Sequence, residues 1–278
     1  MPDSINQPLA PELSISAIIP AYNSEKTIIR SLDSIIKQTT AVYEIIVIDD
    51  GSTDNTAELV SNYIDIHKLI NIKLFRQPNS GVSVARNLGI KHARGNLIAL
   101  LDSDDQWLPD KTRQQLELFR IYGKELGLVA CLTSHSKKGT RNENLITVKF
   151  EDLLWCNHFS SPTVMIWKEL LIENPFNISQ RYSEDYNLWL RIALLGKVIL
   201  INKTLVILDD KPVYGYMGLS SQLWKMETGE LSNYLMLYNN ANIKWYQYYF
   251  FSAYSLIKFF IRCAVSYKRR IFSFMKPA

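Results

Sequence analysis

Three carboxylates end the apolar run Leu97-Ile98-Ala99-Leu100-Leu101-Asp102-Ser103-Asp104-Asp105. A short continuous apolar run is typical of a strand that is covered on both faces of a sheet. In open α/β sheets, ligands bind just beyond the carboxyl ends of such strands. Carboxylates this close repel one another unless a divalent cation or hydrogen-bond donors offset their charge. The stretch therefore predicts a buried strand that delivers acids to a binding site, and the alternative is a solvated turn that caps the next helix.

An alternation of strand and helix patterns surrounds this stretch. Short apolar runs, typical of strands, alternate with longer segments that carry apolar residues at every third or fourth position, typical of helices. The predicted strands are residues 15–20, 44–48, 71–75 and 97–101, and the predicted helices are residues 25–36, 54–64, 82–93 and 109–122. Such repeated units predict an α/β fold with a mostly parallel sheet, helices on both faces and right-handed crossovers.

Polar residues also follow the first two predicted strands. Residues 20–23 are Pro-Ala-Tyr-Asn, and residues 49–52 are Asp-Asp-Gly-Ser. Because the carboxyl ends of parallel strands share one edge of the sheet, we expect both segments to lie beside residues 102–105. Ser52 and Thr53 have the alternative role of capping the next helix. The chain contains neither Gly-x-Gly-x-x-Gly nor a Walker lysine motif, which argues against a dehydrogenase and a P-loop enzyme.

The composition is that of a globular protein, with 47% hydrophobic and 21% charged residues among 278. Seven of the 31 Lys and Arg, and none of the 27 Asp and Glu, lie in residues 231–278, so the remainder carries a small negative charge. The three Cys lack metal-ligand spacing and cannot all pair within one chain, which favours a reducing compartment, and the four His form no ligand cluster. The N-terminus does not have the pattern of a secretory signal, so we expect a cytoplasmic protein.

Residues 245–270 have the pattern of an amphipathic helix. Polar residues recur at every third or fourth position and leave a broad apolar face that is rich in aromatic side chains. The pattern indicates a helix in a membrane interface, with its cations toward anionic lipid, so we expect a peripheral membrane contact and no nucleic acid partner. Lys258 and Arg262 interrupt the run that a transmembrane span needs. The alternative is an ordinary helix packed on the rest of the chain or on a partner chain.

Five segments, in this order, resemble the motifs of the family 2 glycosyltransferases. They are Ile18-Ile19-Pro20-Ala21-Tyr22-Asn23, Ile46-Val47-Ile48-Asp49-Asp50-Gly51-Ser52-Thr53-Asp54, Gly81-Val82-Ser83-Val84-Ala85-Arg86-Asn87, Leu101-Asp102-Ser103-Asp104-Asp105 and Tyr182-Ser183-Glu184-Asp185-Tyr186-Asn187-Leu188-Trp189. The resemblance is close over residues 14–107, and it rests on the order and spacing of the motifs together. It implies the GT-A fold, a Rossmann-like α/β fold, and a nucleotide-sugar donor.

The resemblance also implies a role for each matching residue. The residues implied in the nucleotide-sugar site are Pro20, Tyr22, Asp50, Arg86, Asp102 and Ser103. Of these, Tyr22 would lie against the base, Asp50 would bind the uracil edge, and Arg86 would reach the pyrophosphate. Arg86 has the alternative role of a helix-surface residue paired with an acid, and Tyr22 that of a packed aromatic.

Asp102 and Asp104 match the Asp-x-Asp pair, which implies binding of Mg2+ or Mn2+. Such hard cations prefer oxygen ligands and neutralise the charge that develops on a leaving diphosphate. Asp185 would be the general base of a single displacement with inversion, and Glu184 would orient its loop. The alternative for Asp185 is a helix N-cap.

Two departures from the family pattern restrict the prediction. Residues 213–221 contain no histidine, so metal binding would rest on Asp104 and the diphosphate. The Gln-x-x-Arg-Trp segment of processive synthases is absent from the chain, so we expect one sugar to be added per encounter.

The predicted function is transfer of a hexose-type sugar from a UDP-sugar to a glycan acceptor, lipid-linked, in bacterial surface-polysaccharide synthesis at the inner face of the plasma membrane. The alternatives are a non-catalytic nucleotide-binding or scaffold protein and a nucleotidyltransferase. The predicted layout is a flexible lead-in, a GT-A catalytic domain with a nucleotide-sugar half and an acceptor half, and a basic aromatic helical tail. Their residues are 1–13, 14–240 (halves 14–107 and 108–240) and 241–278.

Overall fold

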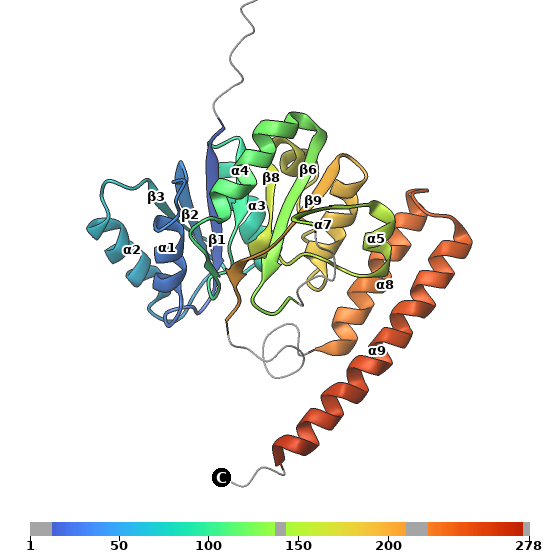
Figure 1. Cartoon of the computed structure of the whole chain (residues 1–278). Helices are drawn as coiled ribbons and strands as arrows, with labels where there is room; N and C mark the ends of the chain where they lie inside the picture. Colours follow the sequence, from blue (N-terminus) through green and yellow to red (C-terminus); the bar gives the residue numbers. More distant parts are fainter. Residues whose placement is uncertain (1–12, 137–142, 210–221, 275–278) are drawn as a thin grey trace, which may run out of the picture.

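The computed structural model describes residues 13–136, 143–209 and 222–274, with side chains as far as Ser266. Residues 1–12 of the predicted lead-in and the histidine-free segment 213–221 lie outside the described residues. The described chain forms a central sheet with helices on both of its faces, and a helical hairpin at one side (Figure 1).

The first four strands form the parallel half of the sheet. They lie side by side in the order β3-β2-β1-β4, and each pair among them is parallel. Their bounds are β1 (Ile15–Ala21), β2 (Glu44–Asp49), β3 (Ile72–Arg76) and β4 (Leu97–Leu100). β1, β2 and β4 are buried along their whole length, as the continuous apolar runs predict. This half of the predicted fold is confirmed.

The second half of the sheet is mixed. β8 pairs antiparallel with both β4 and β6, whereas β6 and β9 are parallel. Two short strands, β5 and β7, pair antiparallel with β9. The bounds are β5 (Gln106–Trp107), β6 (Leu126–Thr133), β7 (Leu145–Val148), β8 (Met165–Trp167) and β9 (Lys197–Ile207). The α/β fold class is confirmed, and the antiparallel strands are the part that helix and strand patterns did not predict.

Two hydrophobic cores lie on opposite faces of the sheet because side chains alternate along each strand. Ile18 and Ile46 face the core that includes α3 and α7, whereas Ile19 and Val47 face the core that includes α1, α2 and α4. The helices on the first face are α3 (Val82–His92), α5 (Phe150–Trp155), α6 (Lys168–Glu173) and α7 (Glu184–Ala193). The helices on the second face are α1 (Ile28–Ile36), α2 (Thr56–Ile66) and α4 (Lys111–Tyr122).

The last two described helices, α8 (Leu223–Asn239) and α9 (Trp245–Phe274), run side by side as a hairpin (Figure 1). Tyr234 and Leu237 of α8 and Phe251 of α9 join the first core. Trp155 of α5 packs edge-on against three aromatic rings of α9, with ring centroids 5.1 to 5.7 Å away. α9 is therefore packed on the rest of the chain over its N-terminal half.

Three polar side chains of α9, those of Ser255, Lys258 and Arg262, contact carboxylates of α8. Lys258 Nζ lies 2.7 Å from Glu230 Oε1, and an Arg262 guanidinium nitrogen lies 2.6 Å from Glu227 Oε2. The prediction that these two cations point toward anionic lipid is wrong, because the carboxylates of α8 hold them inside the hairpin. The division of the chain at residues 240 and 241 stays a proposal.

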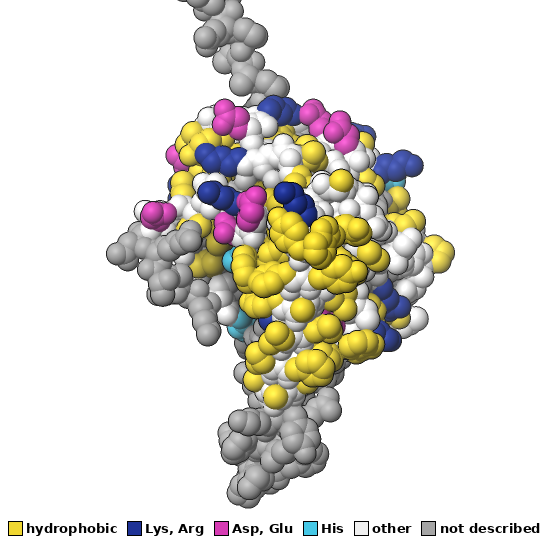
Figure 2. Space-filling model, turned by 90° about the vertical axis from the view of Figure 1, so that its right-hand side faces the viewer, with side chains coloured by type: hydrophobic (Ala, Val, Ile, Leu, Met, Phe, Trp, Pro, Cys, Tyr) yellow, Lys and Arg dark blue, Asp and Glu magenta, His cyan; other side chains and the backbone are white. Residues whose placement is uncertain are grey.

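The outward face of the hairpin is apolar instead. Figure 2 shows hydrophobic side chains gathered along it. The exposed members are Trp224, Trp245, Tyr246, Tyr249, Phe250, Ile257, Phe260, Ile261 and Val265, and we call this set the aromatic face. None of the helices in the described part of the chain is both long enough and apolar enough to span a membrane.

Candidate active site

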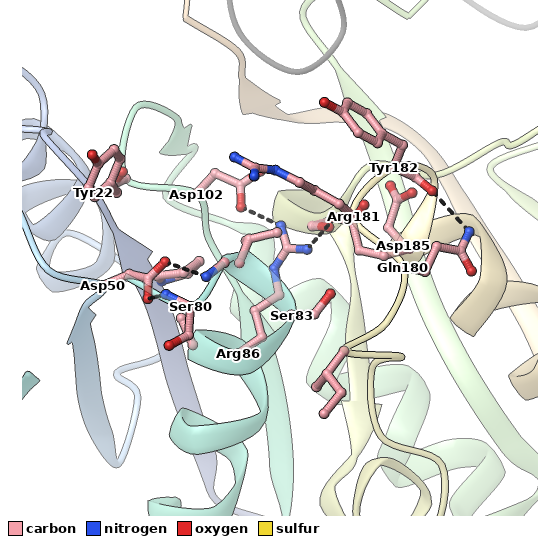
Figure 3. A pocket seen from close by; sticks show the side chains of 18 of the residues that line it. Tyr22, Asp50, Ser80, Ser83, Arg86, Asp102, Gln180, Arg181, Tyr182 and Asp185 are labelled. Atoms are coloured by element: carbon pink, nitrogen blue, oxygen red, sulfur yellow. Dashed lines mark hydrogen bonds and ion pairs between the residues drawn. The ribbon is translucent and has the colours of Figure 1, made fainter. Parts of the chain in front are cut away.

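A cavity of about 750 Å³ lies at the carboxyl ends of β1, β2 and β4 (Figure 3). All eight residues expected at the site line it: Pro20, Tyr22, Asp50, Arg86, Asp102, Ser103, Asp104 and Asp185. The parallel half of the sheet supplies the first seven of these from strand ends and from α3, and α7 supplies the eighth. Their roles stay predictions, but the structure brings all of them to one place.

The turn after β4 is held from two sides. Ser31 of α1 donates its hydroxyl to the backbone carbonyls of Ser103 (3.0 Å) and Asp105 (2.7 Å). Asp105 is buried, and its carboxylate accepts the backbone N–H of Asp209, just after β9. Asp105 therefore anchors the turn, while Asp102 and Asp104 line the cavity.

Asp50 shapes the wall of the cavity next to β2. Its carboxylate accepts the backbone N–H groups of Ser80 (2.8 Å) and Gly81 (2.9 Å), and the side-chain amide of Gln77 (2.7 Å). Gly81, the N-cap of α3, has a φ of 94°, a conformation that favours glycine. Asp50 thus fixes the loop before α3, and its predicted contact with a uracil edge stays a prediction. Tyr22 is half exposed at the rim.

Arg86 links the two halves of the chain beneath the cavity. It is 4% exposed, and its guanidinium lies 2.8 Å from Asp102 and 3.1 Å from Glu184. The same guanidinium lies over the ring of Phe176, 5.2 Å from its centroid. Arg86 is thus buried and not on a helix surface, and Glu184 has a partner that the sequence did not identify. The Nε of Arg86 has no hydrogen-bond partner among the described residues, and contact with a pyrophosphate stays a prediction.

Asp185 stands in the first turn of α7, directly after Ser183 and Glu184. Burial, followed by the charge of neighbouring Glu184, raises the pKa of Asp185 to about 7, and Arg86 opposes the rise. The carboxylate also accepts the backbone N–H of Tyr186 at 2.6 Å. A carboxylate whose pKa lies near neutral pH can take a proton from a hydroxyl and later return it to solvent, which suits a general base.

The segment before α7 has an unusual conformation that places Asp185. Ser183 has a φ of 54°, and the amide of Gln180 bonds to the carbonyls of Tyr182 (2.9 Å) and Ser183 (3.1 Å). Gly229 of α8 lies so close that a Cβ there would stand 2.3 Å from the carbonyl oxygen of Tyr182. Helix α8 thus closes over this segment, and only glycine allows the approach.

The donor atoms at the turn after β4 fit a divalent cation. Asp102 and Asp104 both line the cavity, and within the described ranges no cluster of three or more His, Cys, Asp or Glu suited to a metal occurs. Mg2+ bound with nucleotides uses one or two carboxylates together with phosphate oxygens and water, and Mn2+ has similar ligand preferences. Two carboxylates are therefore a sufficient protein contribution.

Gln180, Arg181 and Ser83 are among the cavity residues to which the sequence analysis gave no role. Arg181 points into the cavity from the loop before α7 (Figure 3). Ser83 is buried in the first turn of α3, and its hydroxyl has no partner among the described residues. The sequence could have indicated Arg181 as a cation of the site, because Arg181 lies only four residues before Asp185.

The strand order, the acids after β4 and the cavity define a GT-A fold with a candidate nucleotide-sugar site. The chain belongs to glycosyl transferase family 2, whose family model matches residues 16–179. The predicted family is thereby confirmed.

Several curated proteins are similar to this chain. An uncharacterized glycosyltransferase of Rickettsia felis is 35% identical over 70% of this chain, and the chain spans 32% of that protein. The UDP-Glc:alpha-D-GlcNAc-diphosphoundecaprenol beta-1,3-glucosyltransferase WfgD of Escherichia coli is 34% identical over 68% of this chain and 73% of its own length. The putative teichuronic acid biosynthesis glycosyltransferase TuaG of Bacillus subtilis is 32% identical over 66% of this chain and 73% of its own length.

Solved structures show the same fold. The structure of S. aureus TarS 1-349 in complex with UDP has a TM-score of 0.65 and 22% identity, and the match covers 88% of this chain and 71% of that one. The mannosyltransferase PcManGT of Pyrobaculum calidifontis, in complex with GDP-Man and Mn2+, has a TM-score of 0.61 and 19% identity, with 80% of this chain and 63% of that one covered.

Proposed function

We propose that this chain transfers a single hexose-type sugar from a UDP-sugar to a hydroxyl of a lipid-linked glycan, with inversion at the anomeric carbon. The observation that carries the proposal is the position of Asp185. Its carboxylate, with a pKa of about 7, lines the same cavity as Asp102 and Asp104. Such a displacement requires a general base and, in the same cavity, a pair of carboxylates that can hold a divalent cation against the diphosphate.

The donor assignment rests on the cavity and on the relatives. A volume of about 750 Å³ is within the range of ligand pockets. WfgD is named for UDP-Glc, and one TarS structure contains UDP. We assign the uracil ring of the donor to the rim near Tyr22 and Asp50. We assign its diphosphate to the turn with Asp102, Ser103 and Asp104.

Asp102 and Asp104 would hold Mg2+ or Mn2+ together with the diphosphate. When bound, the cation supplies a positive charge that stabilises the departing UDP. Arg86 keeps Asp102 in place through its 2.8 Å ion pair, and Arg181 points into the same cavity as a second cation.

The reaction is a single displacement. An acceptor hydroxyl oxygen forms a bond to the anomeric carbon while the bond from that carbon to the β-phosphate oxygen breaks, and the electron pair leaves with UDP. The hydroxyl proton passes to Asp185. Because Asp185 acts from the face opposite the leaving group, the anomeric configuration inverts.

We place the enzyme at the cytoplasmic face of a bacterial plasma membrane, in surface-polysaccharide synthesis. The aromatic face of α8 and α9 is exposed along the hairpin, and Lys268, Arg269 and Arg270 follow it in the sequence. Aromatic and aliphatic side chains next to cations suit the headgroup region of an anionic bilayer. The WfgD name includes a diphosphoundecaprenol acceptor, which supports a lipid-linked acceptor here.

The test is a UDP-release assay over a panel of UDP-sugars and octyl glycosides, with Mn2+ or Mg2+ present. We expect metal-dependent release from one donor, loss of release in Asp104→Ala, and a fall of about 100-fold or more in Asp185→Asn with UDP affinity retained. Consumption of nucleoside triphosphates, or release that is unchanged in Asp104→Ala, would contradict the proposal.

A further inference from the structure

A second cavity, of about 460 Å³, adjoins the first one. Ser183, Asp185 and Met226 line both cavities. Asp185 therefore stands where the two cavities meet, with the space assigned to the donor on one side of it. A hydroxyl in the second cavity would meet the base where the two spaces join.

Half of the residues that line the second cavity belong to the α8–α9 hairpin, which lies beyond residues 16–179 of the family match. Glu230 of α8 and Lys258 of α9 are its central polar pair, with Lys258 Nζ 2.7 Å from Glu230 Oε1. Lys258 also donates to the backbone carbonyl of Trp155, 2.9 Å away. Contacts with two other elements thus hold the ammonium group of Lys258.

The charges in this cavity favour a neutral ligand that is rich in hydroxyls. Two cations, Lys258 and Arg262, line it together with two carboxylates, Asp185 and Glu230. Arg262 is also paired with the buried carboxylate of Glu227 at 2.6 Å. A phosphate needs an excess of positive charge, which these five groups do not supply. Sugar hydroxyls need donors and acceptors side by side, and an ammonium–carboxylate pair offers both.

We infer that the second cavity binds the terminal sugar of the acceptor, with Glu230 accepting hydrogen bonds from its hydroxyls and Lys258 donating to them. This inference rests on the proposed function. It assigns acceptor selection to the C-terminal hairpin, since both residues belong to it. The attacking hydroxyl then lies against Asp185 without a rearrangement of the donor site.

The position of Ile261 extends the inference to the rest of the acceptor. Ile261 lines the second cavity, and it also belongs to the aromatic face, where it is 59% exposed. The cavity therefore borders the apolar outer surface of α9. An acceptor with its sugar in the cavity can lay an apolar chain along this surface, which is why octyl glycosides are suitable probes.

The first experiment compares the wild type with the double variant Glu230→Gln, Lys258→Met. The two changes remove a carboxylate and an ammonium together, so neither charge is left unpaired. We expect the KM for the octyl glycoside acceptor to rise at least tenfold, with the KM for the UDP-sugar and acceptor-independent hydrolysis unchanged. Lys244→Met is the matched control because Lys244 lies between α8 and α9, outside both cavities. An unchanged acceptor KM in the double variant would overturn the inference.

A second experiment needs no turnover. Cys156 is exposed and lines the second cavity, whereas Cys131 is buried. In full-length protein with Cys263→Ser, alkylation of Cys156 reports on access to the cavity. We expect an octyl glycoside from the panel to slow alkylation at least threefold with UDP present, and the double variant to lose this protection. UDP alone should not protect, because it binds on the other side of Asp185.

The two experiments separate the inference from the proposed function. Protection of Cys156 without sugar transfer would support the cavity as a glycoside site and contradict the proposed reaction. Transfer with a wild-type acceptor KM in the double variant would support the reaction and overturn the cavity assignment. The absence of protection by every glycoside in the panel would also overturn it.

Discussion

The guanidinium of Arg86 lies 3.1 Å from the carboxylate of Glu184, 98 residues further along the chain. Through its other nitrogen Arg86 also holds Asp102, so a single buried cation connects the donor side of the cavity with the turn that carries Asp185. Removing it would leave two carboxylates without their shared partner in a poorly solvated place.

Arg86→Lys tests this bridge, because an ammonium group cannot reproduce the two-sided geometry of a guanidinium. We expect sugar transfer to fall about 100-fold and the protein to lose about 2–3 kcal/mol of stability. Steady-state kinetics and urea unfolding measure the two effects. Arg113→Lys, an exposed arginine paired with Asp110, is the control and should change stability by less than about 0.5 kcal/mol. Full activity in Arg86→Lys would show that the bridge is dispensable.

The raised pKa of Asp185 predicts the pH profile of transfer. A general base must be deprotonated, and burial raises the pKa of this carboxyl to about 7. We therefore expect kcat/KM to increase with pH and to level off above about pH 7, whereas an ordinary aspartate would be fully active from about pH 5. In Asp185→Asn, this rise of kcat/KM with pH should be absent. A flat profile between pH 5.5 and 8.5 would contradict the role of Asp185.

Gly229→Ala should disturb the segment before α7. The new methyl group would stand 2.3 Å from the carbonyl oxygen of Tyr182, so α8 must move away from the segment that positions Asp185. We expect a loss of about 1–3 kcal/mol in stability and a larger fall in transfer than in UDP affinity. Calorimetric titration with UDP and the transfer assay separate the two. Ser232→Ala, exposed on the same helix, should leave both unchanged.

The aromatic face predicts binding to anionic vesicles. Tyr249 and Phe260 are 65% and 67% exposed on the outer side of α9. Replacing both by Glu places carboxylates where apolar side chains would enter the interface, so we expect partition into phosphatidylglycerol vesicles to fall at least tenfold. Ile172→Glu, on α6, is the control for an exposed apolar residue elsewhere. Vesicle flotation measures the partition. Equal partition of the wild type and the Tyr249→Glu, Phe260→Glu variant would exclude this face as the contact.

Lys111 predicts an unusual pH dependence of stability. It is fully buried over the ring of Trp107, 4.1 Å from the centroid, and burial lowers its pKa from 10.5 to about 8. The folded chain therefore loses this proton more readily than the unfolded chain. The stability cost of burying the charged ammonium group is therefore complete below about pH 8, and it fades as the pH rises toward 10.5.

Lys111→Met should consequently stabilise the protein by about 1–2 kcal/mol at pH 7 and by less at pH 10. Urea unfolding at the two pH values measures the difference. Lys124→Met is the matched control because Lys124 also lies over an indole ring, that of Trp167, but is exposed. A stability loss in Lys111→Met that is equal at both pH values would contradict the assigned cause.

Local sequence determined the parallel half of the fold. The run from Leu97 to Asp105 predicted a buried strand that ends in acids, because a continuous apolar segment must be covered on both faces wherever it lies. The polar residues after β1 and β2 then had to meet those acids, since parallel strands end at one edge. The predicted site residues at these strand ends accordingly line one cavity: Pro20, Tyr22, Asp50, Asp102, Ser103 and Asp104.

Tertiary structure alone decided the rest. The pattern of α9 predicted an amphipathic helix, but Glu227 and Glu230 of α8 determined that Lys258 and Arg262 face inward, while the aromatic face points outward. The partnership of Arg86 with Glu184 and the approach of Gly229 to Tyr182 likewise join segments that are far apart in the chain. The pattern of residues along the chain indicates whether a position is buried. Which side chain buries it depends on how distant elements pack. This packing placed Asp185 between two cavities.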